Sequence, residues 1–235
     1  MSGDVESRKG SPGHHPLTWN GHELHLLGDG SLFWPGHDVL LVADLHLGKE
    51  AVFRARGIPI PDGAGGETLG RLERTRRWCG ARHLAILGDL VHGPEAWTPE
   101  VVQAMERWRD GVPGRVWWIR GNHDRAAGPP PRTLALEEVE DGKRWSGVEL
   151  RHDPPPDGRS ALTPIICGHL HPVVRLRAAG TRARLPCFVV DPRMLVLPAY
   201  GVFTGGHPVV GRKERRLLVA AGEAVVEVAV GTPGP

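Results

Sequence analysis

The chain has 235 residues, of which 40% are hydrophobic and 24% charged, and its formal net charge at pH 7 is +2. This length can bury a large core in one domain, and the composition is that of a globular protein rather than a disordered or membrane-spanning one. A net charge this small excludes an overall field that would hold the protein on nucleic acid or anionic lipid, so any basic surface has to be local.

The predicted strands and helices begin after residues 1–16, a polar segment rich in Gly and Pro that we expect to be a disordered tail. Residues 17–231 are expected to form a single domain. The tail lacks the apolar core of a signal peptide, and no apolar run reaches the roughly 18 residues of a membrane span. The three cysteines show no paired motif, which favours reduced thiols. We therefore expect a cytoplasmic protein with no membrane partner.

The first half of the chain alternates between strand and helix patterns. Asn20-Gly21 and Asp29-Gly30 are hairpin-turn dipeptides between short apolar runs. Residues 48–66 are expected to be a long loop with room for a helical turn. The predicted strands are 17–19, 23–27, 31–34, 39–43, 83–87 and 115–120, and the predicted helices are 67–79 and about 99–109.

The second half of the chain is rich in strand patterns and poor in helix patterns. An alternating half joined to a strand-rich half indicates an α/β fold of two facing sheets with helices outside, closed into one domain. The predicted strands of this half are 133–136, 145–151, 162–167, 173–178, 186–190, 194–197, 216–220 and 224–230.

Four predicted strands end in residues that can bind metals. The carboxyl ends of neighbouring strands in an α/β fold meet at one edge of the sheet, so four such endings indicate one shared site. Glycine precedes three of the endings, as expected where backbone must approach a ligand closely. The endings are Asp44-Leu45-His46, Gly88-Asp89, Gly121-Asn122-His123-Asp124 and Gly168-His169-Leu170-His171.

The donor types indicate which ions could bind. Asp44 and His46 are two residues apart, which puts both side chains on one face of an extended backbone, and the same holds for His169 and His171. A lone carboxylate such as Asp89 suits a bridge between two cations. A mixed oxygen and nitrogen set without thiolate suits Mn²⁺, Fe or Zn²⁺. The predicted ligands are Asp44, His46, Asp89, Asn122, His169 and His171, with His152 as the further imidazole.

Other residues near these strand ends have more than one possible role. His123 can move a proton near neutral pH, and the carboxylate of Asp124 can fix its ring. His92 is a substrate contact, a capping residue or a surface histidine. Lys49, Arg54 and Arg56 follow the first ligands and form either a phosphate contact or a solvated loop.

The order of the four endings, with His152 between the third and fourth, resembles the calcineurin-like metallophosphoesterase superfamily. A narrower resemblance is to the ligase-associated DNA damage response phosphoesterases of bacteria, and it covers roughly residues 17–220. The segments that carry it are Val42–Lys49, Arg56–Pro61, His169–Pro172, Leu185–Phe188 and Leu197–Gly206.

The resemblance implies a four-layer αββα sandwich, with two facing mixed β-sheets flanked by helices. It implies a manganese-dependent endonuclease that uses two divalent ions to cleave single-stranded DNA, with DNA repair proteins such as a DNA ligase as partners. His123 would act at the leaving oxygen with Asp124 orienting it. Apart from the resemblance, the positions of Lys49, Arg54 and His92 near the ligands make them our predicted substrate contacts. One metal would take Asp44, His46 and His171, the other would take Asn122, His152 and His169, and Asp89 would bridge them.

Two other classes of function stay open at this point. A phosphatase or phosphodiesterase for a small ester would use the same metals, but such enzymes often carry an inserted lid, and residues 40–175 hold no long insertion. A non-catalytic scaffold would lack His123 or several of the ligands, and all of these residues are present. The residues alone predict two-metal phosphoester hydrolysis, and only the resemblance points to DNA.

Overall fold

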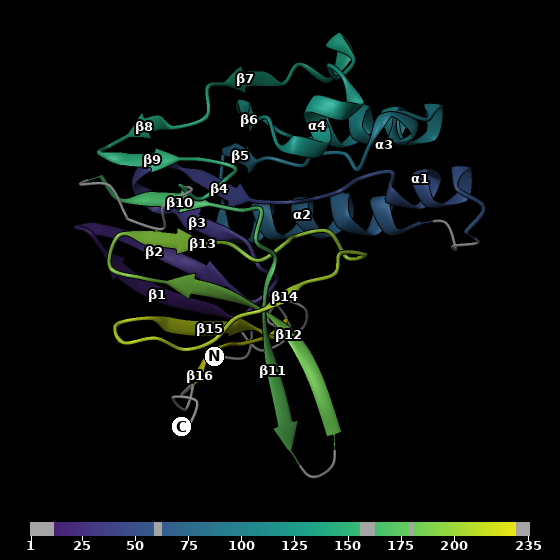
Figure 1. The fold of residues 1–235 in the computed structure, drawn as a ribbon. Coiled ribbons are helices and arrows are strands. Elements are labelled where there is room, and N and C mark those ends of the chain that lie inside the picture. The colour runs from purple at the N-terminus through teal and green to yellow at the C-terminus, as the bar shows by residue number, and fades with distance from the viewer. Residues whose placement is uncertain (1–11, 59–62, 156–162, 179–180, 229–235) are drawn as a thin grey trace, which may run out of the picture.

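Two β-sheets face each other, and helices pack on the outside of one of them (Figure 1). The computed structural model describes residues 12–58, 63–155, 163–178 and 181–228. The seven-stranded first sheet is antiparallel from β1 to β4 and parallel from β4 to β7. Its strands, in spatial order, are β1 (His14–Trp19), β2 (His22–Leu27), β3 (Leu32–Trp34), β4 (Val39–Val42), β5 (His83–Leu87), β6 (Val116–Ile119) and β7 (Glu137–Val139).

The helices form the connections between the parallel strands of the first sheet. Helix α3 begins at Thr98, whose Oγ1 accepts a hydrogen bond of 3.3 Å from the backbone N–H of Val101, as an N-cap residue should. The helices are α1 (Lys49–Ala55), α2 (Ala64–Cys79), α3 (Pro99–Asp110) and α4 (Asn122–Ala127), and the 3-10 turns are η2 (Pro35–His37), η3 (Pro94–Ala96) and η4 (Arg132–Leu134).

The second sheet has nine strands, and it is also mixed. Its main path runs in the order β14-β11-β12-β13-β10-β9-β8, and β15 pairs with β12 and β16. The strands β9, β10 and β13 are parallel to one another. The strands are β8 (Lys143–Trp145), β9 (Val148–Leu150), β10 (Ile165–Cys167), β11 (Pro172–Ala178), β12 (Thr181–Val190), β13 (Met194–Val196), β14 (His207–Pro208), β15 (Arg216–Ala220) and β16 (Val225–Val228).

The main core lies between the two sheets. Leu41 of β4 and Ile166 of β10 belong to one buried apolar cluster, so the alternate side chains of both sheets meet there. A second cluster joins the outer face of the first sheet, including Ile86, to Leu72 of α2 and Met105 of α3. These two apolar clusters pack the parallel strands on both faces. They therefore fix the positions of the strand ends, where the polar residues begin.

The expected sandwich of two mixed sheets flanked by helices is confirmed. In the described residues all the helices lie between β4 and β7 in the chain, on the side of the first sheet (Figure 1). Most strands of the second sheet follow one another through short turns, which leave no length for a crossover helix. The fourth layer therefore differs from our expectation, because the outer face of the second sheet packs Val174 and Val189 without a helix over it in the described part.

Several predicted boundaries were wrong. Residues 48–66 are not a long loop, because α1 buries Val52 and α2 begins at Ala64. Residues 133–136 are largely the η4 turn, which buries Leu134, rather than a strand. Residues 145–151 form part of a hairpin, because Ser146 and Gly147 both have positive φ and turn β8 into β9.

The start of the domain also differs from its predicted position. β1 begins at His14, where backbone pairing with Leu27 continues the hairpin to β2, so residues 14–16 are not part of a tail. Residues 1–11, where the rest of the predicted tail falls, and residues 229–231 lie outside the described residues. Within those described, no helix combines the length and the apolar character that crossing a bilayer requires.

Candidate metal centre

The predicted ligands all follow strands at the carboxyl ends of the two sheets. Asp44 and His46 follow β4, Asp89 follows β5, and Asn122 opens α4 directly after β6. His152 follows β9 of the second sheet. A backbone bridge between Ala43 and Ala199, the latter just beyond β13, ties the ends of the two sheets together. The sandwich therefore brings residues that lie more than 100 positions apart in the chain to one place.

The first cluster contains Asp44, His46 and His171, whose donor atoms lie within 4.8 Å of one another. The Nε2 atoms of His46 and His171 are 3.3 Å apart, and His171 Nε2 lies 3.6 Å from Asp44 Oδ1. Two imidazole nitrogens this close to each other and to a carboxylate oxygen can hold a metal ion between them.

The second cluster contains Asp89, His152 and His169 within the same limit of 4.8 Å. His152 Nε2 lies 3.1 Å from Asn122 Oδ1, 3.1 Å from His169 Nδ1 and 3.6 Å from Asp89 Oδ1. The Nδ1 atom of His152 lies 3.0 Å from the carbonyl oxygen of Leu87. That carbonyl can only accept, so His152 carries its proton on Nδ1 and turns the lone pair of Nε2 into the cluster.

Asp89 lies between the two clusters. Its Oδ1 faces His152, and its Oδ2 lies 3.8 Å from His46 Nε2. Oδ1 also accepts a hydrogen bond of 2.9 Å from the backbone N–H of His123. Burial raises the pKa of the Asp89 carboxyl. A carboxylate with one oxygen toward each cluster has the arrangement of a bridge between two cations.

Asp44 provides a test of whether a cation fits. Its side chain is fully buried, and its Oδ2 accepts a hydrogen bond of 2.8 Å from the backbone N–H of His169. Its Oδ1 has no hydrogen-bond partner. A buried carboxylate oxygen without a partner is costly unless a positive charge lies against it. The residues present therefore fit a bound cation.

Burial disfavours the charged forms of His46 and His92, and a neutral imidazole is the form that binds a metal ion. Burial, with the nearby His171 and His92, lowers the pKa of His46 to about 2. Burial, with Lys49 and His123, lowers the pKa of His92 to about 4. Burial acts in the same direction on His171, but the nearby carboxylate of Asp44 outweighs it and raises the pKa of His171.

The ligand-bearing loops have strained backbones and closely packed glycines. Asp44, His46, Asp89, His169 and His171 all have positive φ, between 43° and 69°, a region that non-glycine residues seldom adopt. A Cβ on Gly121 would lie 2.0 Å from Asp89 Oδ1, and one on Gly88 would lie 2.0 Å from His152 Nδ1. Each of these glycines makes room for a ligand carried by another strand.

His123 lies beside the first cluster, but Asp124 does not orient it. The ring of His123 approaches that of His46 at 4.9 Å between centroids, and His123 Nδ1 lies 2.7 Å from the carbonyl oxygen of His92. Asp124 instead accepts hydrogen bonds from Trp118 Nε1 and from the backbone N–H groups of Gly121 and Val91. The prediction that Asp124 fixes the His123 ring was wrong, because Trp118 Nε1 and two backbone N–H groups occupy its carboxylate.

His92 and Lys49 also lie at the centre. His92 Nδ1 is 3.1 Å from His46 Nδ1, and the His92 ring stacks on His123 at 4.6 Å. A third group that could hold an ion, formed by His46, His92 and His123, contains no carboxylate. Burial lowers the pKa of Lys49, whose Nζ lies 5.5 Å from the centre of the Phe53 ring.

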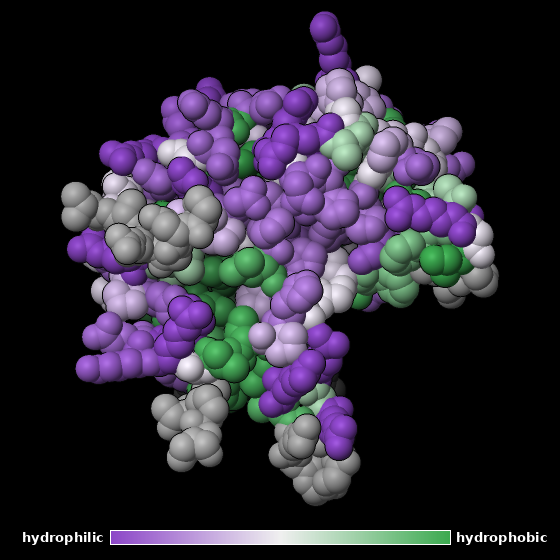
Figure 2. Space-filling view, viewed as in Figure 1, coloured by the Kyte–Doolittle hydropathy of each residue, from purple (hydrophilic) through white to green (hydrophobic). Residues whose placement is uncertain are grey.

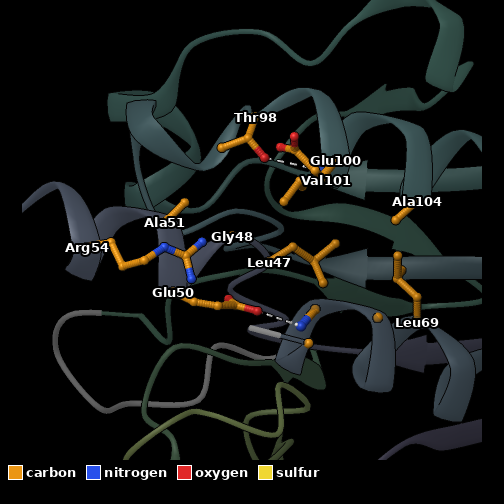
Figure 3. Close-up of a pocket in the computed structure, with 13 residues that line it drawn as sticks. Leu47, Gly48, Glu50, Ala51, Arg54, Leu69, Thr98, Glu100, Val101 and Ala104 are labelled. Atoms are coloured by element: carbon orange, nitrogen blue, oxygen red, sulfur yellow. Dashed lines mark hydrogen bonds between the residues drawn. The ribbon is translucent and has the colours of Figure 1, made fainter. Parts of the chain in front are cut away.

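Arg54 lies away from the two clusters, in a cavity of about 550 Å³ between α1, α2 and the start of α3 (Figure 3). Its side chain extends into this cavity above Glu50, and Glu50 Oε1 accepts a hydrogen bond of 2.9 Å from the backbone N–H of Gly65. Glu50 and Gly65 also line a smaller cavity that reaches His46. Arg54 therefore adjoins the centre without entering it.

The sequence patterns missed residues that surround the centre. Phe203 is 45% exposed, and its ring lies 6.4 Å from that of Phe53, which in turn lies 5.8 Å from the His92 ring. Tyr200 donates a hydrogen bond of 2.8 Å to Asp29 Oδ2, which holds the loop after β13 in place. Both Tyr200 and Phe203 fall in a segment that carried the family resemblance, but no periodicity marked their contacts.

A sequence profile of the calcineurin-like phosphoesterase family matches residues 37–172, which is more than half of the chain. The solved structure of Pseudomonas putida nuclease MPE is similar, with 38% identity, 92% of this chain and 100% of that chain covered, and a TM-score of 0.78. A second structure, the protein of unknown function AQ665 from Aquifex aeolicus, is 18% identical, covers 60% of this chain and 81% of that one, and has a TM-score of 0.37.

No curated protein matches the chain by sequence. The profile match and the 38% identity to the nuclease agree with each other, and both cover the strand ends that carry the clusters. The chain therefore belongs to the calcineurin-like phosphoesterase family and is a metal-dependent phosphoester hydrolase.

Proposed function

We propose that this protein is an endonuclease that cleaves single-stranded DNA with two Mn²⁺ ions and serves in DNA repair. The observation that carries the proposal is the similarity to Pseudomonas putida nuclease MPE, at 38% identity over 92% of the chain. The paired clusters support it from the chemical side, because phosphodiester cleavage by two ions needs two adjacent sites with a shared ligand.

We assign the proposed ligands to the two ions from the distances between their donor atoms. Asp44, His46 and His171 would hold one ion, and Asp89, whose two oxygens face the two clusters, would contribute to both sites. When bound, the two ions supply positive charge for the phosphate and lower the pKa of the attacking water. A mixture of carboxylate, amide and imidazole donors suits Mn²⁺. Asn122, His152 and His169, together with Asp89, would hold the second ion.

His123 is the proposed proton donor to the leaving oxygen. The carbonyl of His92 accepts from Nδ1, so that nitrogen keeps its proton in every state of the ring. Nε2 is then the atom that gains and gives up a proton.

The surroundings of the clusters suit a polymer with bases. Phe203, Phe53 and His92 form a run of aromatic rings beside the first cluster, and a base has a face that can stack on an exposed ring. Lys49 lies at the start of α1 near the same rings and can contact a phosphate. DNA repair proteins, such as a DNA ligase, are the proposed partners.

The test compares three substrates under one set of conditions. Purified protein is stripped of metal, reloaded with Mn²⁺, Zn²⁺ or Fe²⁺, and given a labelled single strand, the matching duplex and a small bis-aryl phosphodiester. We expect cleavage inside the single strand, fastest with Mn²⁺, and slower cleavage of the duplex. Hydrolysis of the small diester with an intact single strand would show that the substrate is a small phosphoester instead.

A further inference from the structure

β11 and β12 form a two-stranded arm that projects from the body of the protein (Figure 1). We define the arm as residues 172–178 and 181–186. The register places Val173 opposite Pro186 and Arg175 opposite Arg184. Residues directly opposite each other in an antiparallel pair share a face, as do residues two apart in one strand. One face of the arm therefore carries Val173 and Pro186 at its base and Arg175 and Arg184 beyond them.

Arginine continues along the arm toward its tip, where Arg177 pairs with Arg182 in the register. Arg175, Arg182 and Arg184 are exposed, and within the described part of the chain none of them forms an ion pair with a carboxylate. Figure 2 shows hydrophilic side chains along the arm where it leaves the body. Like charges directly opposite each other on a sheet destabilise it, so a bound anion would relieve the repulsion between these arginines.

The other face of the arm explains why it keeps its position. Val174 is buried, and Leu176 and Leu185 pack against the same apolar cluster on the outer face of the second sheet. Apolar side chains on one face and arginines on the other make the arm an amphipathic ribbon. Its charged face is therefore held in a fixed direction rather than sampling solvent freely.

The arginine face leads back to the metal centre. A cavity of about 370 Å³ is lined by Val173, Arg184 and Pro186 from that face and by His171 of the first cluster. Arg71 of α2 lines it as well, and its buried Nε has no hydrogen-bond partner. The guanidinium of Arg184 donates to the carbonyl oxygen of Gly206, which fixes it at the rim of the cavity.

We propose that the arginine face of the arm binds the phosphates of a single strand on one side of the scissile bond. The strand runs from the metal centre past His171, through the 370 Å³ cavity, and along the face that carries Arg184 and Arg175. This inference rests on the proposed function, because it takes the substrate to be a nucleic acid strand. Guanidinium groups suit the role, since their planar donors match phosphate oxygens in pairs.

The test removes two arginines and follows two substrates. The variant Arg175→Ala/Arg184→Ala is compared with wild type in cleaving a single strand and in hydrolysing a small bis-aryl phosphodiester, both with Mn²⁺. We expect kcat/KM for the strand to fall by roughly tenfold at about 0.1 M salt, because two charged contacts to phosphate are lost. The plot of log kcat/KM against log salt should become shallower by about 1.4, at about 0.7 for each contact. Hydrolysis of the small diester should not change.

The matched control, Arg107→Ala/Arg132→Ala, removes the same charge from exposed residues of α3 and η4, at the end of the molecule opposite the arm. It should keep both the rate and the salt slope, and Arg175→Lys/Arg184→Lys should keep the slope. The thermal unfolding midpoint of the alanine variant should stay close to that of wild type, because the repulsion that is removed offsets the lost hydrogen bond from Arg184 to Gly206. An unchanged salt slope in the alanine variant, or an equal loss in the control, would overturn the role of the arm. Hydrolysis of the small diester by wild type, with the single strand left intact, would instead overturn the proposed function.

Discussion

The Nδ1 atom of His123 lies 2.7 Å from the backbone carbonyl oxygen of His92, and this contact fixes the ring beside the first cluster. Many histidines that move protons are oriented by a carboxylate. Here the neighbouring carboxylate, Asp124, is taken up by Trp118 and two backbone N–H groups. Because a backbone carbonyl cannot be removed by mutation, the orientation of His123 should survive changes to the side chain of His92.

Replacing His123 with alanine should separate metal binding from proton transfer. The ring of His123 is not needed for either carboxylate-containing cluster. His123→Ala should therefore keep two equivalents of Mn²⁺ by metal analysis, while the rate falls by roughly 10²–10⁴-fold. His92→Ala should lose less, since the carbonyl stays in place. Loss of bound metal from His123→Ala would show that His123 is a ligand instead.

Asp124→Ala should act on stability more than on chemistry. It leaves three buried N–H donors without an acceptor, and hydrogen bonds to a charged group are worth more than neutral ones. We expect the free energy of unfolding in urea to fall by about 3–5 kcal/mol. The exposed Asp110→Ala should leave it unchanged within about 0.5 kcal/mol. A fully stable but slow Asp124→Ala would restore the role of Asp124 as the group that orients His123.

Asp89→Ala should be the most severe change among the ligands, because its two oxygens face both clusters. We expect loss of both Mn²⁺ ions by metal analysis and no measurable hydrolysis of the small diester. Chelation should have the same effect on wild type, and added Mn²⁺ should restore activity to wild type alone. Activity that persists after complete removal of metal would contradict the two-metal assignment.

Gly121→Ala tests the close packing of the ligand loops. The added Cβ would lie 2.0 Å from Asp89 Oδ1, so the carboxylate or the loop has to move. We expect Mn²⁺ affinity, measured by calorimetry, to fall by about 10–100-fold, as it does when the support of a ligand is disturbed. Gly66→Ala in α2 is the control, since its Cβ would meet nothing within 4 Å. It should leave affinity unchanged and should stabilise the helix by about 0.5–1 kcal/mol.

The stability of the metal-free protein should fall in acid. Burial lowers the pKa of His46 to about 2, whereas in the unfolded chain it returns to its ordinary value near 6.5. Between these two pKa values His46 is protonated in the unfolded chain but not in the folded one. The contribution of His46 to the free energy of unfolding is therefore fully present above about pH 6.5 and is lost as the pH decreases. One such group contributes a slope of about 1.4 kcal/mol per pH unit.

Urea unfolding of the metal-free protein between pH 7 and pH 5 measures this slope. The raised pKa of His171 acts in the opposite direction, because its contribution is present at low pH and lost as the pH rises. His46→Gln removes the titrating group and should flatten the profile. A profile that is equally steep in His46→Gln would assign the proton uptake to other residues.

The strand ends could be predicted from the sequence because they depend on local patterns. An apolar run followed by Gly and a metal-binding residue, as at Leu87-Gly88-Asp89, marks the end of a strand. It also indicates at which edge of the sheet that residue lies. His152 could be found in the same way, since it follows the alternating residues of β9. Their convergence then follows from parallel pairing.

Choices between partners that are distant in the chain could not be predicted. Asp124 had a histidine beside it in sequence, but Trp118 and Val91 reach it in space. The pairing of Arg175 with Arg184 could not be predicted either, because the sequence pattern indicated a strand only at 186–190, whereas β12 begins at Thr181. Helix α1 was missed because its buried face consists mainly of Val52 and Glu50, too few residues to show a period.

The glycines before the ligands have a consequence for anyone who would graft this centre onto another protein. Gly121 makes room for Asp89, Gly88 for His152, and Gly168 for Asp44, whose Oδ2 would lie 2.8 Å from an added Cβ. Copying only the donor side chains onto a new scaffold would therefore transfer the ligands without the space they occupy. The transplantable unit is the set of strand ends together, in which each strand supplies the gap for another strand's ligand.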